Sequence, residues 1–154
     1  MTDLLGEPAR SLFATLAHAG DPPVPVAGDT AAAAAAPSGR WVTGQAGCQQ
    51  HGTCVRFALC VGSRSGAGGH QVLEARYRAY GCPHTLAACE WVARQLQGCE
   101  LSALSPAALA QAVGGPLEWA RDLAVPQPKL GRLLVIEDAL RAALCFDPVV
   151  TKGA

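Results

Sequence analysis

The chain has 154 residues, half of them apolar, and a formal net charge of zero at pH 7, which predicts one domain with a proper hydrophobic core. The charged residues form no basic stripe that would indicate nucleic-acid binding. They also form no charged tail that would indicate a partner of opposite charge. No apolar run approaches the roughly 18 to 20 residues of a membrane span, and the N-terminus lacks the pattern of a secretory signal, so we expect a cytoplasmic protein without a membrane anchor.

The N-terminal region is predicted to be a short helix followed by a linker. Residues 4–19 place Leu12 and Leu16 on one apolar face, and Gly20 ends the pattern. Prolines, glycines and an alanine run at 31–36 follow, and helices this short are marginal alone. We therefore expect residues 1–38 to form an N-terminal helix and low-complexity linker, 39–147 to form the main domain, and 148–154 to form a tail.

Three strands are predicted at the start of the main domain, at residues 41–43, 54–61 and 72–80. A polar, glycine-punctuated loop is expected at 44–53, and a flexible connection at 62–69. In the third strand the even-numbered and odd-numbered residues form two different sides, which is typical of a half-exposed antiparallel strand.

Helical patterns occupy the second half of the chain. They cover residues 83–98, a segment from Ser105 as N-cap to Val113, a short stretch at 117–123, and residues 130–145. Strands followed by helices predict an α+β fold, with a three-stranded antiparallel sheet packed against the C-terminal helices.

One thiol lies at a predicted corner between a strand and a helix. The strand at 72–80 ends at Gly81, and the helix begins just after Cys82, with Pro83 at its first position and His84 next. A thiol there lies over the unbonded N–H groups of the helix start, which favour its thiolate form. Cys82 is therefore the leading candidate for chemistry.

The other cysteines are mostly expected to be structural. Seven cysteines is an odd count, and a disulfide framework is not expected in a reducing compartment. No C-x-x-C occurs, so neither a thioredoxin-like motif nor a zinc ribbon is supported. Cys48 and His51 have a spacing that suits a metal ion, although a polar loop without a ligand explains them equally well. Small buried hydrophobes are expected at Cys54, Cys60, Cys89, Cys99 and Cys145.

Several segments together resemble the NifU/IscU-type iron–sulfur cluster assembly scaffolds, over roughly residues 39–144. Residues 74–82 are similar to the strand that runs into the family's central cysteine, and Lys129–Leu130 with residues 137–143 resembles its last helix. Residues 125–129 occupy the place of the proline-containing loop that a dedicated Hsp70-type chaperone recognises. The resemblance implies a NifU/IscU-like fold and a non-enzymatic role in cluster assembly, with a cysteine desulfurase and other assembly proteins as partners.

The family's ligand set is only partly present. The family carries three cysteines and an aspartate, with a histidine beside the last cysteine, and Cys82 matches the central one. Residues 51–53 stand in place of the family's Cys-Gly-Asp run, and Cys48 lies three residues upstream. The final His-Cys pair falls on Gly131 and Arg132. For an iron–sulfur cluster or a single zinc ion, the candidate ligands are therefore Cys82, Cys48, His51 and His84.

Three functions follow from these residues. The first is a scaffold that accepts sulfur and iron at Cys82, with a homodimer as one way to supply missing ligands. The second is a degenerate paralogue that binds the desulfurase or one zinc ion and modulates assembly without holding a cluster. The third, least favoured, is a thiol enzyme with Cys82 as nucleophile and His84 or His51 as base. Arg132 is expected to be a surface charge; if it points to the ligand site, it opposes a cation and attracts a thiolate.

Overall fold

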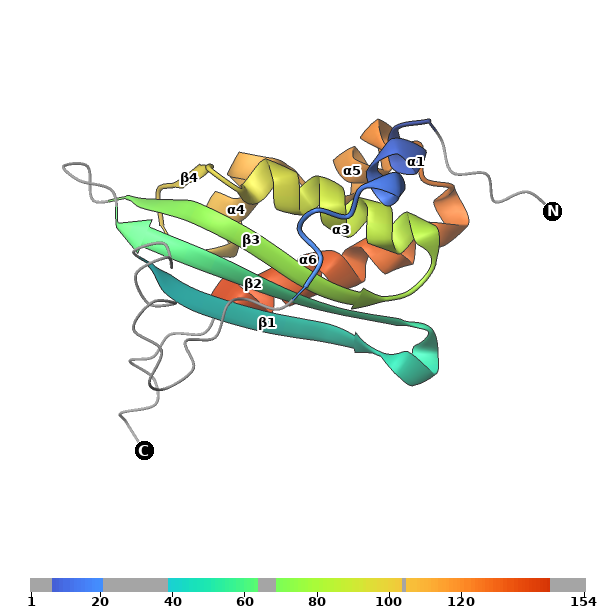
Figure 1. The fold of residues 1–154 in the computed structure, drawn as a ribbon, viewed down its shortest axis with the longest axis horizontal. Coiled ribbons are helices and arrows are strands. Elements are labelled where there is room, and N and C mark those ends of the chain that lie inside the picture. Colours follow the sequence, from blue (N-terminus) through green and yellow to red (C-terminus); the bar gives the residue numbers. More distant parts are fainter. Residues whose placement is uncertain (1–6, 21–38, 64–68, 104, 145–154) are drawn as a thin grey trace.

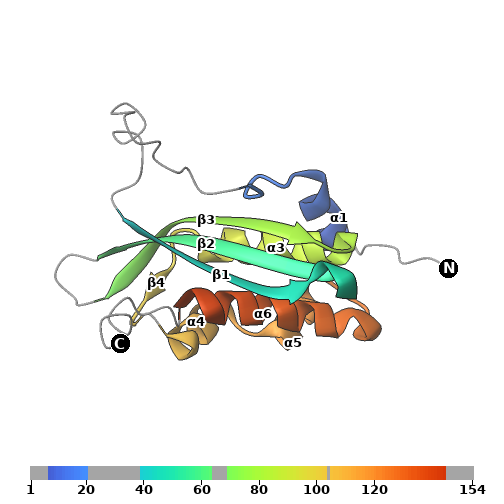
Figure 2. The ribbon, with the colours of Figure 1, turned by 90° about the horizontal axis from the view of Figure 1, so that it is seen from below.

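The computed structural model describes residues 7–20, 39–63, 69–103 and 105–144. Four strands form one antiparallel sheet in the order β1-β2-β3-β4, and α3 and α6 lie against one face of it (Figures 1 and 2). The α+β class predicted from the order of the elements is therefore confirmed. The alanine run at 31–36, Cys145 and the predicted tail at 148–154 lie outside the described residues.

The sheet contains the three predicted strands and one more. β1 (Arg40–Cys48), β2 (Thr53–Ser63) and β3 (His70–Tyr80) are all longer than predicted. The fourth strand, β4 (Glu100–Leu101), pairs with the start of β3. The prediction of three strands was incomplete because a two-residue strand is too short to show the alternation that identifies one.

The loop predicted at 44–53 was wrong for residues 44–48, because β1 continues to Cys48 in register with β2, and the turn between the strands covers only residues 49–52. Glycine in the strand suggested a loop, but Gly44 is there because α6 (Leu130–Leu144) packs directly on it. A Cβ at Gly44 would collide with the carbonyl oxygen of Ala139 and the backbone nitrogen of Ala143. A glycine inside a strand often marks such a close approach of another backbone.

A bulge in β3 changes which side chains reach the core. The register with β2 shifts between Cys60 and Val61, whose partners are Glu74 and Val72, so residue 73 has no direct partner. One extra residue moves the following positions to the opposite face. Val72 is consequently buried along with residues 75 and 77, although simple alternation placed it on the other side.

α3, α4 and α6 begin at the predicted residues, whereas α5 begins at Pro116, one residue before its predicted start. Proline is the first residue of α3, α4 and α5. The hydroxyl of Ser105 accepts a hydrogen bond from the N–H of Ala108, which confirms the predicted N-cap. The first helix ends at Ala14, before the predicted end at residue 19. Besides α6, the helices and 3-10 turns are α1 (Glu7–Ala14), η1 (Gln49–His51), α3 (Pro83–Leu96), α4 (Pro106–Val113), α5 (Pro116–Asp122) and η2 (Gln127–Lys129).

The core lies between the sheet and the helices. The rings of Phe57 and Tyr77 are 5.8 Å apart between centroids on the helix-facing side of β2 and β3. Trp119 of α5 is buried, and its indole nitrogen donates to the carbonyl of Val113 at 2.8 Å, which satisfies its polar atom. No helix within the described ranges combines the length and the apolar character needed to cross a membrane.

A side chain at Gly44 should weaken the contact between β1 and α6. We expect Gly44→Ala to lower the free energy of unfolding by about 1–3 kcal/mol, because the new methyl group must displace helix backbone. The control is Gly131→Ala in α6, where nothing lies near the added Cβ. That change should raise stability by about 0.5–1 kcal/mol. Urea unfolding measures both, and equal stability of the two variants would contradict the packing described.

Candidate thiolate site at the start of α3

Cys82 lies at the corner where β3 passes into α3, as predicted. It is the N-cap of α3 with extended backbone (φ −76°, ψ 166°), and Pro83 is the first helical residue. Its carbonyl accepts the N–H of Leu86 at 3.2 Å, and its Sγ lies 3.5 Å from the hydroxyl oxygen of Thr85. Gly81 leaves room for this arrangement, since a Cβ there would lie 3.1 Å from Thr85. The thiol is half-buried and held over the first turn of the helix.

The surroundings of Cys82 favour its thiolate. Burial raises the pKa of the thiol, but hydrogen bonds from the hydroxyl and N–H of Thr85 and the nearby guanidinium of Arg132 outweigh burial, so the pKa is lowered overall. Arg132 comes from the first turn of α6 and is itself partly buried. Arg132 was expected to be a surface charge, but its guanidinium lies close enough to Cys82 to lower the pKa of the thiol. The pair brings together two segments that are far apart in the sequence.

The structure does not gather the other candidate ligands around Cys82. Cys48 ends β1 and precedes η1, and His51 is exposed in that turn. His84 is buried in the first turn of α3, with 2% of its surface exposed. Among the described residues, no three His, Cys, Asp or Glu side chains lie close enough together to hold a metal ion.

The donor set near Cys82 fits a cation poorly. Zinc and iron–sulfur clusters take thiolate, imidazole or carboxylate ligands. Arg132 lies near Cys82 and offers donors without a lone pair, and its positive charge repels a metal ion. A guanidinium beside a thiolate is instead suited to holding negatively charged sulfur at this corner.

The remaining cysteines mostly have the structural role that was predicted. Cys60 and Cys89 are fully buried, and burial raises the pKa of each thiol. Cys99 is half-buried, and burial raises its pKa as well. Cys54 differs from the prediction of core packing, since it is only partly buried and accepts a hydrogen bond from the Gln45 amide at 3.4 Å. Every cysteine within the described residues is a free thiol rather than part of a disulfide.

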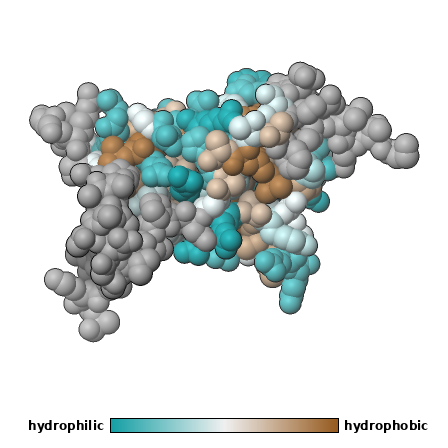
Figure 3. All heavy atoms as spheres, in the orientation of Figure 1, coloured by the Kyte–Doolittle hydropathy of each residue, from teal (hydrophilic) through white to brown (hydrophobic). Residues whose placement is uncertain are grey.

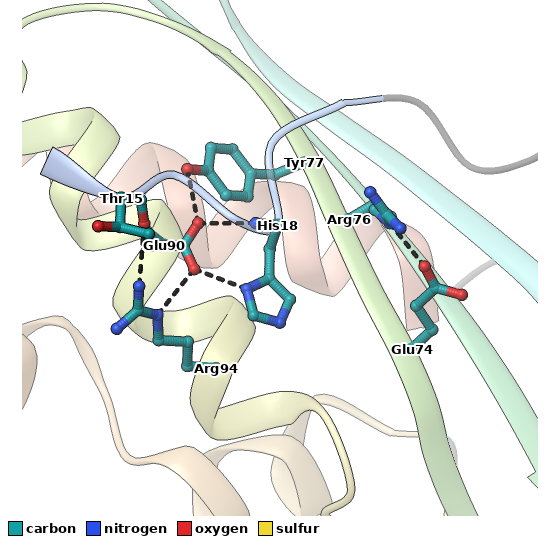
Figure 4. Close-up of polar contacts among 7 residues, drawn as sticks. All are labelled: Thr15, His18, Glu74, Arg76, Tyr77, Glu90 and Arg94. Atoms are coloured by element: carbon teal, nitrogen blue, oxygen red, sulfur yellow. Dashed lines mark hydrogen bonds and ion pairs between the residues drawn. The ribbon is translucent and has the colours of Figure 1, made fainter. Parts of the chain in front are cut away.

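A buried carboxylate on α3 was missed from the sequence. Glu90 has no exposed side-chain surface and accepts hydrogen bonds from the backbone N–H of His18 at 2.9 Å, the His18 ring at 2.6 Å, the Tyr77 hydroxyl at 3.2 Å and the Arg94 guanidinium at 2.9 Å (Figure 4). Burial raises the pKa of Glu90, but the bonds from His18 and Arg94 outweigh it and lower the pKa. The sequence did contain a signal for this buried carboxylate, because Glu90 is an acidic residue within the apolar stripe of the predicted helix.

This carboxylate fastens residues 15–20, which we call the strap, to the body of the protein. Arg94 also donates to the carbonyl of Thr15 at 2.9 Å. Gly20 donates to the carbonyl of Tyr77 at 2.8 Å, and Tyr77 donates to the carbonyl of His18 at 3.2 Å, so the strap runs parallel to β3 and pairs with its edge. His18 is therefore part of the hydrogen-bond network around Glu90.

Neither a family model nor a curated protein matches this chain. A scan against protein-family models finds no match, and a search of curated proteins finds no significantly similar sequence. The resemblance to NifU/IscU-type scaffolds therefore stays a hypothesis based on residues 74–82 and on the order of the later segments.

The thiolate character of Cys82 should depend on Arg132. We expect Cys82 to be alkylated by iodoacetamide at lower pH than Cys99, because the pKa of Cys82 is lowered and that of Cys99 is raised. In Arg132→Gln the reaction of Cys82 should begin at higher pH, because the positive charge that favours the thiolate is gone. Peptide mass spectrometry at a series of pH values measures both sites. The control is Arg121→Gln, an exposed arginine on α5, and an identical pH profile in all three proteins would contradict the role of Arg132.

Removing the charge of Glu90 should loosen the strap and change the acid stability. We expect Glu90→Gln to lose about 1–3 kcal/mol, since buried hydrogen bonds are weakened. The pKa of Glu90 is lower in the folded protein, so its stabilisation is present above the unfolded pKa of about 4.3 and is lost as pH falls through the folded pKa. Glu90→Gln should therefore lose less stability between pH 5 and pH 3 than the wild type, by thermal unfolding. Equal acid sensitivity would argue against this linkage.

Proposed function

We propose that this protein accepts sulfur at Cys82 in iron–sulfur cluster assembly, as a carrier rather than an enzyme. The observation that carries the proposal is the half-buried Cys82 thiol, which Thr85 and Arg132 favour as a thiolate at a helix start. The resemblance of residues 74–82 to the strand and central cysteine of NifU/IscU-type scaffolds supports the same role. A cysteine desulfurase is the proposed donor, and other assembly proteins are the proposed recipients.

The proposed transfer is a thiol exchange that needs no further reactant. The Cys82 thiolate attacks the outer sulfur of the persulfide on the desulfurase, and a new sulfur–sulfur bond forms at Cys82. The bond between the outer sulfur and the desulfurase cysteine breaks, and that cysteine leaves as a thiolate. Charge is conserved, since one thiolate is consumed and one is released. Arg132 can pair with negative sulfur at Cys82 before and after the step.

A second candidate is a degenerate paralogue that modulates assembly without holding a cluster. Arg132 supports it, because this residue stands at the position of the family's last cysteine and its charge opposes a metal ion beside Cys82. Such a protein would bind the desulfurase, or one zinc ion, and compete with a complete scaffold. The first candidate would also hold a cluster if a homodimer supplied the missing ligands.

The proposed chaperone contact, residues 125–129, lies just before the first turn of α6. Residues 125–129 lead into α6 through η2, and Gln127 and Pro128 are exposed there. This surface is available for an Hsp70-type chaperone to dock. Because Arg132 follows a few residues later in α6, a partner bound here would lie close to the helix turn that approaches Cys82.

Sulfur transfer can be tested with a cysteine desulfurase and its substrate cysteine. We expect intact-protein mass spectrometry to show the gain of one sulfur atom, located at Cys82 after digestion. Cys82→Ser should lose the adduct, and Arg132→Gln should form it about tenfold more slowly if the charge contributes about 1.4 kcal/mol. Cys54→Ser is the matched control, because this cysteine is also partly buried.

Two outcomes decide between the candidates. An adduct that persists in Cys82→Ser would remove the sulfur-acceptor proposal. Iron and acid-labile sulfide, measured after anaerobic reconstitution, separate a cluster scaffold from a modulator: stoichiometric amounts of both that disappear in Cys82→Ala support the scaffold, and their absence with retained desulfurase binding supports the paralogue.

A further inference from the structure

The strap pairs with the edge of β3 that faces away from β2. It uses both backbone groups of Tyr77: the N–H of Tyr77 donates to the carbonyl of His18 at 3.2 Å, and its carbonyl accepts the N–H of Gly20 at 2.8 Å. Figure 4 shows this part of the strap beside β3. The bridge between Ala19 and Tyr77 is parallel, so this edge of β3 already accepts an extended segment of backbone.

Ala79 presents the next pair of backbone groups along the same edge. The register of β2 and β3 is unbroken from Tyr77 to Tyr80, and backbone groups two residues apart in a strand point to the same neighbour. The N–H and C=O of Ala79 therefore point away from β2, as those of Tyr77 do. Among the described residues, neither group bonds to the strap. In a parallel ladder the strap's next donor would be residue 22, and Pro22 has no N–H.

A cavity of about 630 Å³ lies on the side to which Ala79 points, since it extends from β3 to the strap and to α3. Leu16 of the strap and Leu86 of α3 supply apolar wall, together with Tyr80, whose side chain is 56% exposed. In Figure 3 hydrophobic side chains gather between the strap and the start of α3, beside hydrophilic ones over the strands. The cavity thus combines an open strand edge with apolar walls.

We propose that this edge binds an extended polypeptide segment of a partner protein, which pairs with Ala79 as an added strand and places apolar side chains against Leu16, Tyr80 and Leu86. In an antiparallel pairing, one residue of the guest exchanges both hydrogen bonds with Ala79. Main-chain bonds to a sheet edge then give affinity, and pockets for alternate side chains give specificity. The cavity supplies such a pocket directly beside the open edge.

An extended peptide fits this edge better than a small apolar molecule does. A peptide backbone offers an acceptor for the N–H of Ala79 and a donor for its carbonyl, so both bonds form in one pairing. A hydrocarbon would leave both groups without a partner when it displaced water from them, which costs free energy. Charge does not select the ligand: no carboxylate of the described residues lines the cavity, and Arg78, which does, already takes part in another interaction.

The test uses the full chain and a fluorescein-labelled pentapeptide of alternating threonine and valine, followed by fluorescence anisotropy. We expect saturable binding of one peptide per protein. A copy of the peptide methylated on every backbone nitrogen should bind about tenfold more weakly or worse, because it has no N–H to donate to Ala79.

Two variants test the two parts of the surface. Ala79→Pro removes the N–H that points away from β2, at an edge position where a strand tolerates proline, and should weaken binding about fivefold to tenfold. Ala79→Gly keeps both backbone groups and should bind the peptide as the wild type does. Leu86→Ala shortens the apolar wall and should weaken binding, whereas Leu117→Ala, a 72% exposed leucine of α5 that does not line the cavity, should not.

Amide hydrogen exchange, read by NMR, locates the contact. In the free protein the N–H of Ala79 should exchange faster than that of Tyr77, which is bonded to the strap, and the peptide should slow exchange at Ala79 about tenfold or more.

Three outcomes would overturn the proposal: no saturable binding, equally tight binding of the methylated peptide, or binding that leaves exchange at Ala79 unchanged. Circular dichroism checks the fold of Ala79→Pro; if this variant unfolds, the methylated peptide and the exchange rates of the wild type decide. Sulfur transfer to Cys82 is measured separately without the peptide, so the failure of one proposal leaves the other standing.

Discussion

The contact of α6 with β1 determines where Arg132 lies relative to Cys82. Gly44 lets the helix backbone rest on the strand at Ala139 and Ala143, and Gly47 meets the side chain of Val135 one step further along. The helix therefore runs antiparallel to β1, with its first turn at the end where β1 finishes. β1 and β3 run in the same direction, because each pairs antiparallel with β2. The first turn of α6 consequently arrives at the corner where β3 enters α3, and Arg132 reaches Cys82.

The Glu90 network fixes the opposite edge of the sheet in a comparable way. A buried carboxylate is costly unless charged and hydrogen-bonding partners surround it, and here the partners come from the strap, β3 and α3 itself. Their combined effect is to hold residues 15–20 along β3. The strap in turn supplies Leu16, Ala19 and Gly20 to the wall of a cavity of about 630 Å³ at the end of β3. The buried hydrogen bonds of Glu90 thus help to form a cavity at the protein surface.

Local features of the fold were predictable from the sequence, and distant pairings were not. The Pro83 helix start, the Ser105 cap and the α+β order depend on signals within a few residues, and each is confirmed. β4 and the bulge in β3 leave no periodic signal, because one is two residues long and the other interrupts the period. His18 and Glu90 are 72 residues apart, and Arg132 meets Cys82 only through the packing of α6. The spacing of Cys48 and His51 predicted metal ligands instead, because spacing in the sequence reports only on residues that are close together in the chain.

Arg132 gives the corner at Cys82 a chemical preference. The chain as a whole is neutral, yet the guanidinium of Arg132 lowers the pKa of the Cys82 thiol. Leu86 lines the cavity and its N–H bonds to the carbonyl of Cys82, so one helical turn separates the cavity from the thiol. Local positive charge at Cys82 raises the affinity for anions and lowers it for metal cations. The guanidinium of Arg132 therefore favours a negatively charged sulfur at Cys82 and disfavours a metal cation beside it.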